Sequence, residues 1–459
     1  MNIGICHSRN SSVAIAFLLS GLLVFSSAVS AQEALLATVE TTTTSPSAEV
    51  APEQSIDLTT DLNPPLPVAA VDPATESAAP AAVDSGIPRR FHYHFRLGVR
   101  SVYDDNINLA HDEEFRISDF YTSIEPSLML GVGDTEMRIE NYIRLDYIPA
   151  VFIFADHDEN NSIQHVARLE GQYRANRLTL NFSQMVQIMD GVDVQAQNSA
   201  GGLDQQVNLD VAGRTRFNIY STHGNLAYYL TGKTFLSGGA DYTSTQYSSL
   251  ISSEIFSGNI FINYNYSQKI VVGLGGSAGV NRVDDPTPDQ TFEQANVRVS
   301  YQATGKIDLA ASGGVEFRHF DGDTRDQYTS PVYELSLNYL PFDGTRISLT
   351  ANRRTLNSAI LAAQDYAVTN ISVGVQQRML QRFFLALSAG YENSDYFSTL
   401  SDSGTTRADD YFFVQPSVAA KVTRFWTVGA YYLHRANTSS LDAFSFHDNQ
   451  VGLRSTLEF

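Results

Sequence analysis

From residue 91 to the end of the chain, apolar and polar side chains alternate. The first such segment, 91–100, has aromatic and aliphatic side chains at its odd positions and mostly basic side chains at its even positions. A period of two is typical of a β-strand with one apolar and one polar face. The same pattern recurs at 136–147, 307–318 and 450–459, and none of the four apolar faces carries a charge. The pattern predicts strands whose apolar faces lie against a nonaqueous medium.

The connections between these strands alternate in length. Short turns are expected near 133–134, 175–176, 231–232, 267–268, 304–305, 343–344, 379–380 and 423–424. Longer polar connections are expected near 104–114, 156–162, 190–213, 245–253, 282–291, 320–328, 355–366, 393–410 and 434–445. Short turns at one end and long loops at the other are typical of outer-membrane barrels. We therefore predict an all-β fold, a closed antiparallel transmembrane β-barrel of about 18 strands over residues 91–459.

The composition divides the N-terminal part of the chain from the predicted barrel. Residues 1–31 are typical of a secretory signal peptide, because Arg9 precedes an apolar run and a small-residue tail that ends at Ala31. An N-terminal membrane anchor is the alternative. Residues 32–90 hold eight of the 15 prolines and no aromatic side chain before Phe91, too little apolar bulk to fold by burial. We expect a disordered, acidic, Pro-rich periplasmic tail that acts as a spacer, as a docking strap for a periplasmic export partner, or as a lumen plug.

The composition of residues 91–459 agrees with a barrel in most respects. This region holds 48 of the 50 aromatic residues, and all four lysines lie in or beside predicted short turns. Four prolines fall within predicted strands, where each removes a ladder hydrogen bond, so we expect bulges or strand ends there. These are Pro126, Pro149, Pro331 and Pro416. A soluble β-sandwich or propeller is the alternative fold.

Charge and motifs argue against several functions. A net charge of −20 argues against a nucleic-acid partner, because phosphate binding needs basic surfaces. Gly275–Gly279 matches the G-x-S-x-G motif of hydrolases, but that motif needs a turn and a helix, and here it lies in an alternating run. His92 and His94 share one strand face without a third ligand, and the aspartates of 321–326 lack the terminal glutamate of a recognised calcium loop. We expect no catalytic residue, no cofactor and no metal.

The polar faces of the strands carry charges of both signs, which implies water inside the barrel because an unsolvated charge is costly. Ion pairing between neighbouring strands and control of solute selectivity are the two roles open to these residues. The lumen-facing candidates are Arg96, Arg100, Arg138, Glu140, Arg144, Asp146, Arg298, Glu316, Arg318 and Glu334.

Short segments carry a family resemblance. Tyr103-Asp104-Asp105-Asn106-Ile107 resembles a hallmark of the outer-membrane β-barrel porins that are often linked to exopolysaccharide export loci. The turn at Tyr339–Thr345 is similar to the Pro-containing periplasmic turns of that family, and the terminal Phe459 resembles the signal read by the barrel-assembly machinery. The resemblance implies a closed antiparallel barrel that passes small solutes or polysaccharide. We expect a channel rather than an enzyme, because no nucleophile, base and orienting group can be assembled from the spacing of the residues. A structural or adhesion scaffold acting through its loops, and an outer-membrane hydrolase, are the alternatives.

An even number of strands places both ends of the barrel on one side of the membrane. The tail, Phe459 and the short turns are then expected in the periplasm of a Gram-negative cell. The acidic long loops are expected outside, next to lipid and lipopolysaccharide. Barrels of this size leave an aqueous channel unless a loop fills it, and the longest connection, 190–213, is the candidate for an inward constriction. Because the inward candidates hold more arginines than acids, we expect neutral or anionic glycans to pass.

Overall fold

The computed structural model describes residues 91–135, 138, 141–191, 209–211, 213–302, 305–321, 327–399 and 406–459. The predicted signal peptide, 1–31, and the predicted tail, 32–90, therefore lie outside the described residues. Within the described ranges, no helix has the length and apolar character needed to cross a membrane.

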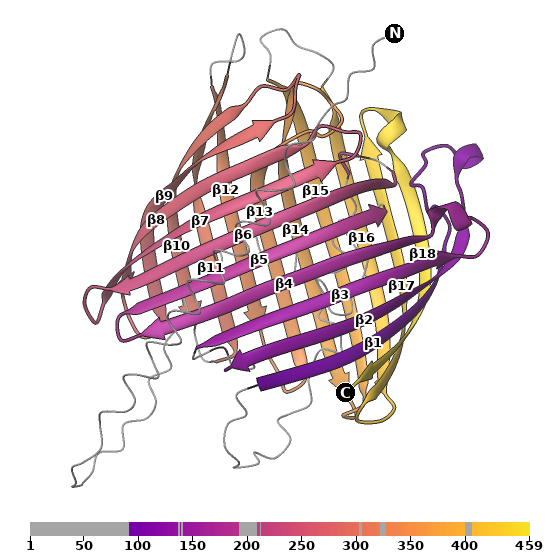
Figure 1. Ribbon diagram of the computed structural model, residues 1–459, viewed down its shortest axis with the longest axis horizontal. Coiled ribbons are helices and arrows are strands. Elements are labelled where there is room, and N and C mark those ends of the chain that lie inside the picture. Colours follow the sequence, from indigo (N-terminus) through magenta and orange to yellow (C-terminus); the bar gives the residue numbers. More distant parts are fainter. Residues whose placement is uncertain are drawn as a thin grey trace, which may run out of the picture. The chain divides into compact units, whose positions relative to one another are not determined.

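The described residues form 18 strands, each antiparallel to the next along the chain (Figure 1). They are β1 (Phe91–Asp104), β2 (Asp119–Gly133), β3 (Tyr142–Phe154), β4 (Ser162–Ala175), β5 (Leu178–Gly191), β6 (Thr215–Tyr229), β7 (Thr234–Tyr247), β8 (Ser253–Asn265), β9 (Ile270–Val283), β10 (Gln290–Gln302), β11 (Ile307–Phe320), β12 (Tyr328–Tyr339), β13 (Thr345–Asn357), β14 (Gln364–Met379), β15 (Phe383–Ser398), β16 (Ala408–Lys421), β17 (Trp426–Ser439) and β18 (Phe446–Glu458). Single-turn helices follow β1 (η1, Glu113–Phe115), β3 (η2, Asp158–Asn160) and β17 (η3, Asp442–Phe444). The predicted barrel and its strand count are confirmed.

The barrel closes where the first strand meets the last. β1 pairs with β2 on one side and with β18 on the other, and Figure 1 shows indigo β1 beside yellow β18. The register runs from Arg96–Glu458 to Asp104–Gln450. The terminal Phe459 exchanges two backbone hydrogen bonds with Phe95, of 3.1 and 2.8 Å, and the two rings stack with their centroids 6.1 Å apart. The last residue thus completes the seam.

The predicted alternation of connections is also confirmed. One end of the barrel, called here the turn end, carries connections such as 176–177 and 230–233. The other, the loop end, carries connections such as 105–118 and 192–214. Because successive strands are antiparallel, short and long connections fall at opposite ends.

The start of β3 differs from the prediction. The strand begins at Tyr142 rather than near residue 136, and residues 136, 137, 139 and 140 lie outside the described residues. Gly133 has a φ of +85°, and a Cβ at this position would lie 2.1 Å from the carbonyl oxygen of Asn141. The chain therefore turns where only glycine fits. Arg138 lies in this turn, with a φ of 56°, and not on a strand.

The outward face of the barrel is apolar. Exposed side chains such as Ile260 (65%), Leu274 (63%) and Leu453 (63%) lie at alternate strand positions. Aromatic side chains are exposed near the turn end, among them Tyr266, Phe342, Phe425, Trp426 and Phe459. An apolar band with an aromatic girdle is the surface that a barrel presents to lipid.

The expectation of bulges or strand ends at the prolines is wrong for three of them. The β2–β3 ladder is interrupted between the pairs Ile124–Val151 and Leu128–Tyr147, which share one register. Pro126 and Pro149 occupy facing positions in this gap, so neither strand offers an N–H there. The β16–β17 ladder likewise skips Pro416 without a shift of register. These prolines remove ladder bonds and insert no residue.

Pro331 lies where one ladder stops. β12 pairs with β13 only from Tyr333–Arg353 toward the turn end, although both strands continue beyond this pair at the loop end. The loop-end part of β13 is therefore free to diverge from β12. This divergence positions the connection between β13 and β14, residues 358–363, which contributes to the site described next.

Candidate pore constriction

Several predicted inward charges are buried in the barrel wall. Arg96, Arg100, Glu316 and Arg318 are 7%, 1%, 3% and 4% exposed, and the residues on either side of each are more exposed. Arg144, Asp146, Arg298 and Glu334 lie on the same alternation and are partly buried. Arg138 is in the β2–β3 turn instead, and Glu140 lies outside the described residues.

Two of these arginine groups are held by glutamates that the sequence analysis did not single out. Arg100 Nε lies 3.3 Å from Glu125 of β2, whose other oxygen is 3.9 Å from Arg454 of β18. Arg144 pairs with Asp146 at 2.7 Å and lies 3.8 Å from Glu170 of β4. Each glutamate lies on the polar face of a strand that neighbours a strand with an inward arginine. This placement is the sequence signal that could have identified them.

A third group links strands that are not neighbours. Arg318 of β11 pairs with Glu316 at 3.0 Å and donates to Gln290 of β10 at 2.6 Å. It also lies 3.6 Å from Asp365 of β14 and donates to the carbonyl of Thr355 on β13. The Arg318 side chain extends from β11 to β14 across the loop-end part of β12, where the β12–β13 ladder is absent.

Arg298 differs from the other inward arginines. Its guanidinium lies 4.2 Å from the ring centroid of Phe261 and donates to Asn263 and Ser237. Within the described residues no carboxylate lies at ion-pair distance from it. A Cβ at Gly273 would come within 2.9 Å of the Arg298 side chain, so glycine makes room for it. Arg298 is thus a partly buried cation surrounded by neutral groups.

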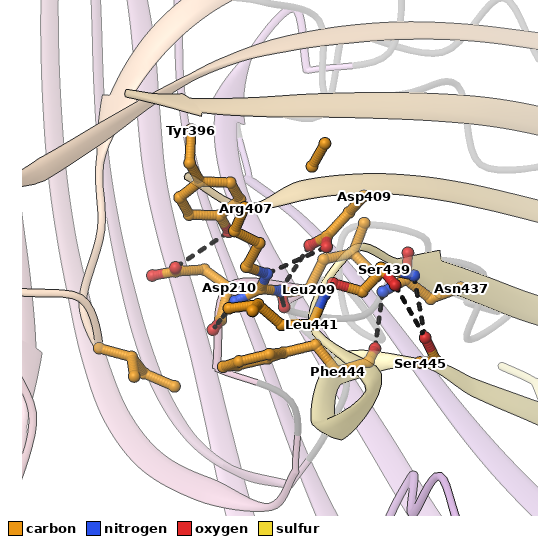
Figure 2. Close-up of polar contacts among 12 residues, drawn as sticks. Leu209, Asp210, Tyr396, Arg407, Asp409, Asn437, Ser439, Leu441, Phe444 and Ser445 are labelled. Carbon is orange, nitrogen blue, oxygen red and sulfur yellow. Dashed lines mark hydrogen bonds and ion pairs between the residues drawn. The ribbon is translucent and has the colours of Figure 1, made fainter. Parts of the chain in front are cut away.

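The end of the longest connection folds into the barrel. Leu209, Asp210 and Val211 are 6%, 4% and 8% exposed. The Asp210 carboxylate accepts hydrogen bonds from Ser358 Oγ at 2.7 Å and from the Ala359 N–H at 2.5 Å. It also accepts one from Tyr396 OH at 3.0 Å (Figure 2). These donors belong to the 358–363 connection and to β15. Burial raises the pKa of Asp210, and the hydrogen bonds to the carboxylate and nearby Arg407 oppose this effect.

Arg407 fastens the same segment from another side. It donates to the carbonyls of Leu209 at 2.5 Å and Asp210 at 3.1 Å, and it binds both oxygens of Asp409 at 3.0 and 2.5 Å. Its guanidinium lies 3.5 Å from the ring centroid of Phe444 (Figure 2). Arg407 is 1% exposed and Asp409 0%. A buried ion pair of this kind costs about 3–5 kcal/mol to break by removing one partner.

Leu209 also belongs to a cluster of buried apolar side chains. Leu209 packs with Ile107 and Leu109 of the β1–β2 loop and with buried side chains of six strands. The strand members are Val102, Tyr121, Ala150, Phe152, Phe154, Tyr411, Phe413, Tyr431, Leu433 and Phe446. Their strand neighbours, such as Phe120 and Phe412, are exposed on the outward face. The cluster is therefore on the enclosed side, where the sequence analysis expected charged residues.

The 358–363 connection links the inward-folded segment to other loop-end connections. The Ala359 carbonyl accepts a hydrogen bond from the Ile251 N–H of the β7–β8 loop, at 2.9 Å. The Ala363 N–H donates to Thr287 of the β9–β10 loop, at 3.0 Å. Ser358 and Ala363 are 0% and 7% exposed. The Ala363 carbonyl also accepts a hydrogen bond from the Thr399 N–H of the β15–β16 connection, at 3.0 Å. This connection thus contacts four other loop-end connections, including the one that carries Asp210.

The G-x-S-x-G segment does not form a nucleophile elbow. Ser277 lies within β9, which continues to Val283, and its hydroxyl donates to Gln294 at 3.0 Å. An elbow needs a sharp turn into a helix after the serine. Most of the 321–326 aspartate segment lies outside the described residues.

Comparison with known proteins found a family model that is similar to the C-terminal part of the barrel. Residues 288–459 match the model of the family described as "Putative beta-barrel porin 2". No curated protein matches the chain in sequence. The closed barrel and its apolar outer face are those of a protein of the Gram-negative outer membrane, as predicted.

Solved structures of outer-membrane proteins also resemble this chain. OpdK from Pseudomonas aeruginosa aligns with a TM-score of 0.41 and 11% identity, over 80% of this chain and 99% of that one. OccK2 (OpdF) from Pseudomonas aeruginosa, solved in complex with glucuronate, has a TM-score of 0.42 and 11% identity over 80% and 96%. OccAB3 from Acinetobacter baumannii has a TM-score of 0.41 and 10% identity over 80% and 99%.

Proposed function

We propose that this barrel is a porin-like diffusion channel for small polar solutes, narrowed at its loop end by chain segments that fold inward. The observation that carries the proposal is the anchoring of Leu209–Val211 by Arg407, Tyr396 and the 358–363 connection. Three connections enter the enclosed side at this level and none is needed to close the barrel. In this proposal the loop end faces the exterior, so the constriction meets solutes as they enter.

The inward charges support a preference for neutral or anionic solutes. Arg100, Arg144 and Arg318 are each paired with carboxylates, so their charges are largely offset. Arg298 has only neutral partners in the described part of the wall and supplies an uncompensated positive charge. A fixed charge in a low-dielectric wall acts on passing ions more strongly than one in bulk water.

Export of a polysaccharide is the second candidate, and it rests on the resemblance at Tyr103–Ile107. A polymer would have to displace the buried contacts of Asp210 and Arg407, so the arrangement described above favours small solutes. A loop-borne adhesion scaffold and a hydrolase remain the alternatives of other classes. No feature of the described residues favours either one.

Planar-bilayer recording with sugar-permeation assays tests the proposal. We expect stable channels with a reversal potential biased toward anions, and passage of monosaccharides in preference to long glycans. Arg298→Gln should shift the reversal potential toward cations. The control Arg378→Gln, which removes the same charge at the turn end, should shift it little. A folded barrel without conductance would refute the channel, and equal passage of long glycans would favour polysaccharide export.

A further inference from the structure

A cluster of three aspartates lies at the loop end of the closing seam. Asp104 ends β1, Asp105 follows it, and Asp448 comes from β18. One carboxylate oxygen from each lies within 4.8 Å of the others. Two oxygens that each sit about 2.4 Å from a calcium ion can be at most about 4.8 Å apart, so the spacing fits a shared cation.

Burial makes this cluster unlike a solvated acidic patch. Asp104 is 3% exposed and Asp448 is 0% exposed. Arg435 forms an ion pair with Asp448, so one guanidinium offsets one of three negative charges. Excess charge with so little access to water needs a compensating cation or protonation. Asp105, which is half-buried, leaves a path from the solvent.

Unused oxygen atoms are a second observation that points to a ligand. Asp448 Oδ1 is buried and has no hydrogen-bond partner among the described residues, and the same is true of Gln450 Oε1. The Gln450 amide lies at the cluster, since its Nε2 donates to Asp104 at 2.9 Å and to Asp448 at 3.2 Å. A buried acceptor without a donor is unfavourable, and a bound cation would remove that penalty.

The surrounding backbone holds the other carboxylates in place. The Asn106 N–H donates to Asp104 at 2.8 Å, and the Asn449 N–H and side-chain amide each donate to Asp105 at 2.7 Å. Carboxylate and amide oxygens are the ligands of hard cations, and an irregular cage supplied by protein suits Ca²⁺ better than Mg²⁺. We propose that Asp104, Asp105 and Asp448, with Gln450 beside them, bind one calcium ion.

The ion would join elements from the two ends of the barrel sequence. Asp104 faces Gln450 in the β1–β18 ladder, and the β1–β2 loop that follows carries Ile107 into the apolar cluster. Calcium would therefore stabilise both the closing seam and the root of an inward-folded loop. The sequence analysis assigned no metal here, because Asp448 is at the far end of the chain from Asp104 and Asp105.

Calorimetry on the folded full barrel in detergent free of lipopolysaccharide tests the site. We expect CaCl₂ to bind with one ion per chain, to bind more tightly than MgCl₂, and to raise the temperature at which the heat-modifiable gel band unfolds. Asp448→Asn and Asp105→Asn should each weaken calcium binding at least tenfold. Asp343→Asn removes the same charge from a turn-end side chain that is 97% exposed, and it should bind like the parent.

The two site variants keep the test decisive. If Asp448→Asn does not fold, the half-buried Asp105→Asn gives the answer. Absence of calcium binding by the parent barrel would overturn the proposal. So would binding that both site variants retain at parental affinity, because the ion would then sit elsewhere.

Discussion

Replacing Asp210 by alanine should release the inward segment and enlarge the channel. The substitution removes a carboxylate that accepts hydrogen bonds from Ser358, Ala359 and Tyr396. It leaves a buried backbone N–H at Ala359 without its acceptor. The Leu209 and Asp210 carbonyl contacts with Arg407 remain, so we expect partial rather than complete release.

The size of the effect follows from two opposing contributions. A hydrogen bond to a charged group contributes about 1.5–3 kcal/mol, and the three here share one carboxylate, so they do not add independently. Removing the carboxylate also removes its own burial cost, which is the cause of the raised pKa of Asp210. We take a net loss of about 1–2 kcal/mol, which lowers the ratio of docked to released segment by roughly 5- to 30-fold.

Single-channel recording measures this ratio directly. Asp210→Ala should spend a larger fraction of time in a high-conductance state, and Ser358→Ala and Tyr396→Phe should each have a smaller effect in the same direction. Asp343→Ala is the control for loss of one acidic side chain. Unchanged conductance and dwell times in Asp210→Ala, with the barrel shown to be folded by its heat-modifiable mobility, would refute the anchoring role of this carboxylate.

Three further predictions concern pH, the lipid-facing surface and the seam. Because the pKa of Asp210 is raised in the folded barrel, its protonation favours the docked segment. The stabilisation of the docked segment by this protonation is fully present below the pKa of about 4 that an aspartate has in the unfolded chain. It is lost as pH rises through the raised pKa of Asp210 in the folded barrel. Conductance should therefore fall on acidification, and this response should be absent in Asp210→Ala. Ile260→Arg should destabilise the barrel by about 2–4 kcal/mol in urea titrations in lipid if this residue lies near the midplane, whereas Ile260→Leu should not. Truncation after Glu458 should slow assembly, measured as the rate at which the heat-modifiable form appears, because it removes two backbone hydrogen bonds at Phe95.

The strand pattern of this barrel was predictable because its determinants are local. Alternation reports which face meets lipid, and a short turn reports where the chain reverses, so both are read from a few adjacent residues. The start of β3, which differs from the prediction, also shows that the prediction rests on local pattern. Met137 and Ile139 stand in phase with Ile143, so residues 136–147 read as one strand, although β3 starts only at Tyr142. Periodicity does not show that Gly133 begins a longer turn.

The constriction was harder to predict because it depends on contacts between distant residues. The 190–213 connection was predicted to fold inward. Its described end, Leu209–Val211, is buried, in agreement with that prediction. Nothing near Asp210 in the sequence indicates Ser358 or Arg407 as partners. One local signal was available. Segments such as 150–154 and 411–413 are apolar at consecutive positions, which is typical of strands buried on both faces.

The apolar cluster and the buried ion pairs explain why a wide barrel can hold a defined constriction. Eighteen strands enclose more space than their own side chains fill, so loops that enter it need contacts strong enough to offset their lost conformational entropy. Leu209, Ile107 and Leu109 supply burial, and Arg407 and Asp210 supply directional contacts. Burial alone would allow the segment many packings, whereas satisfied polar groups fix one. Removal of the polar contacts should therefore leave a segment that still enters the barrel but takes several positions, seen as multiple conductance levels rather than one larger pore.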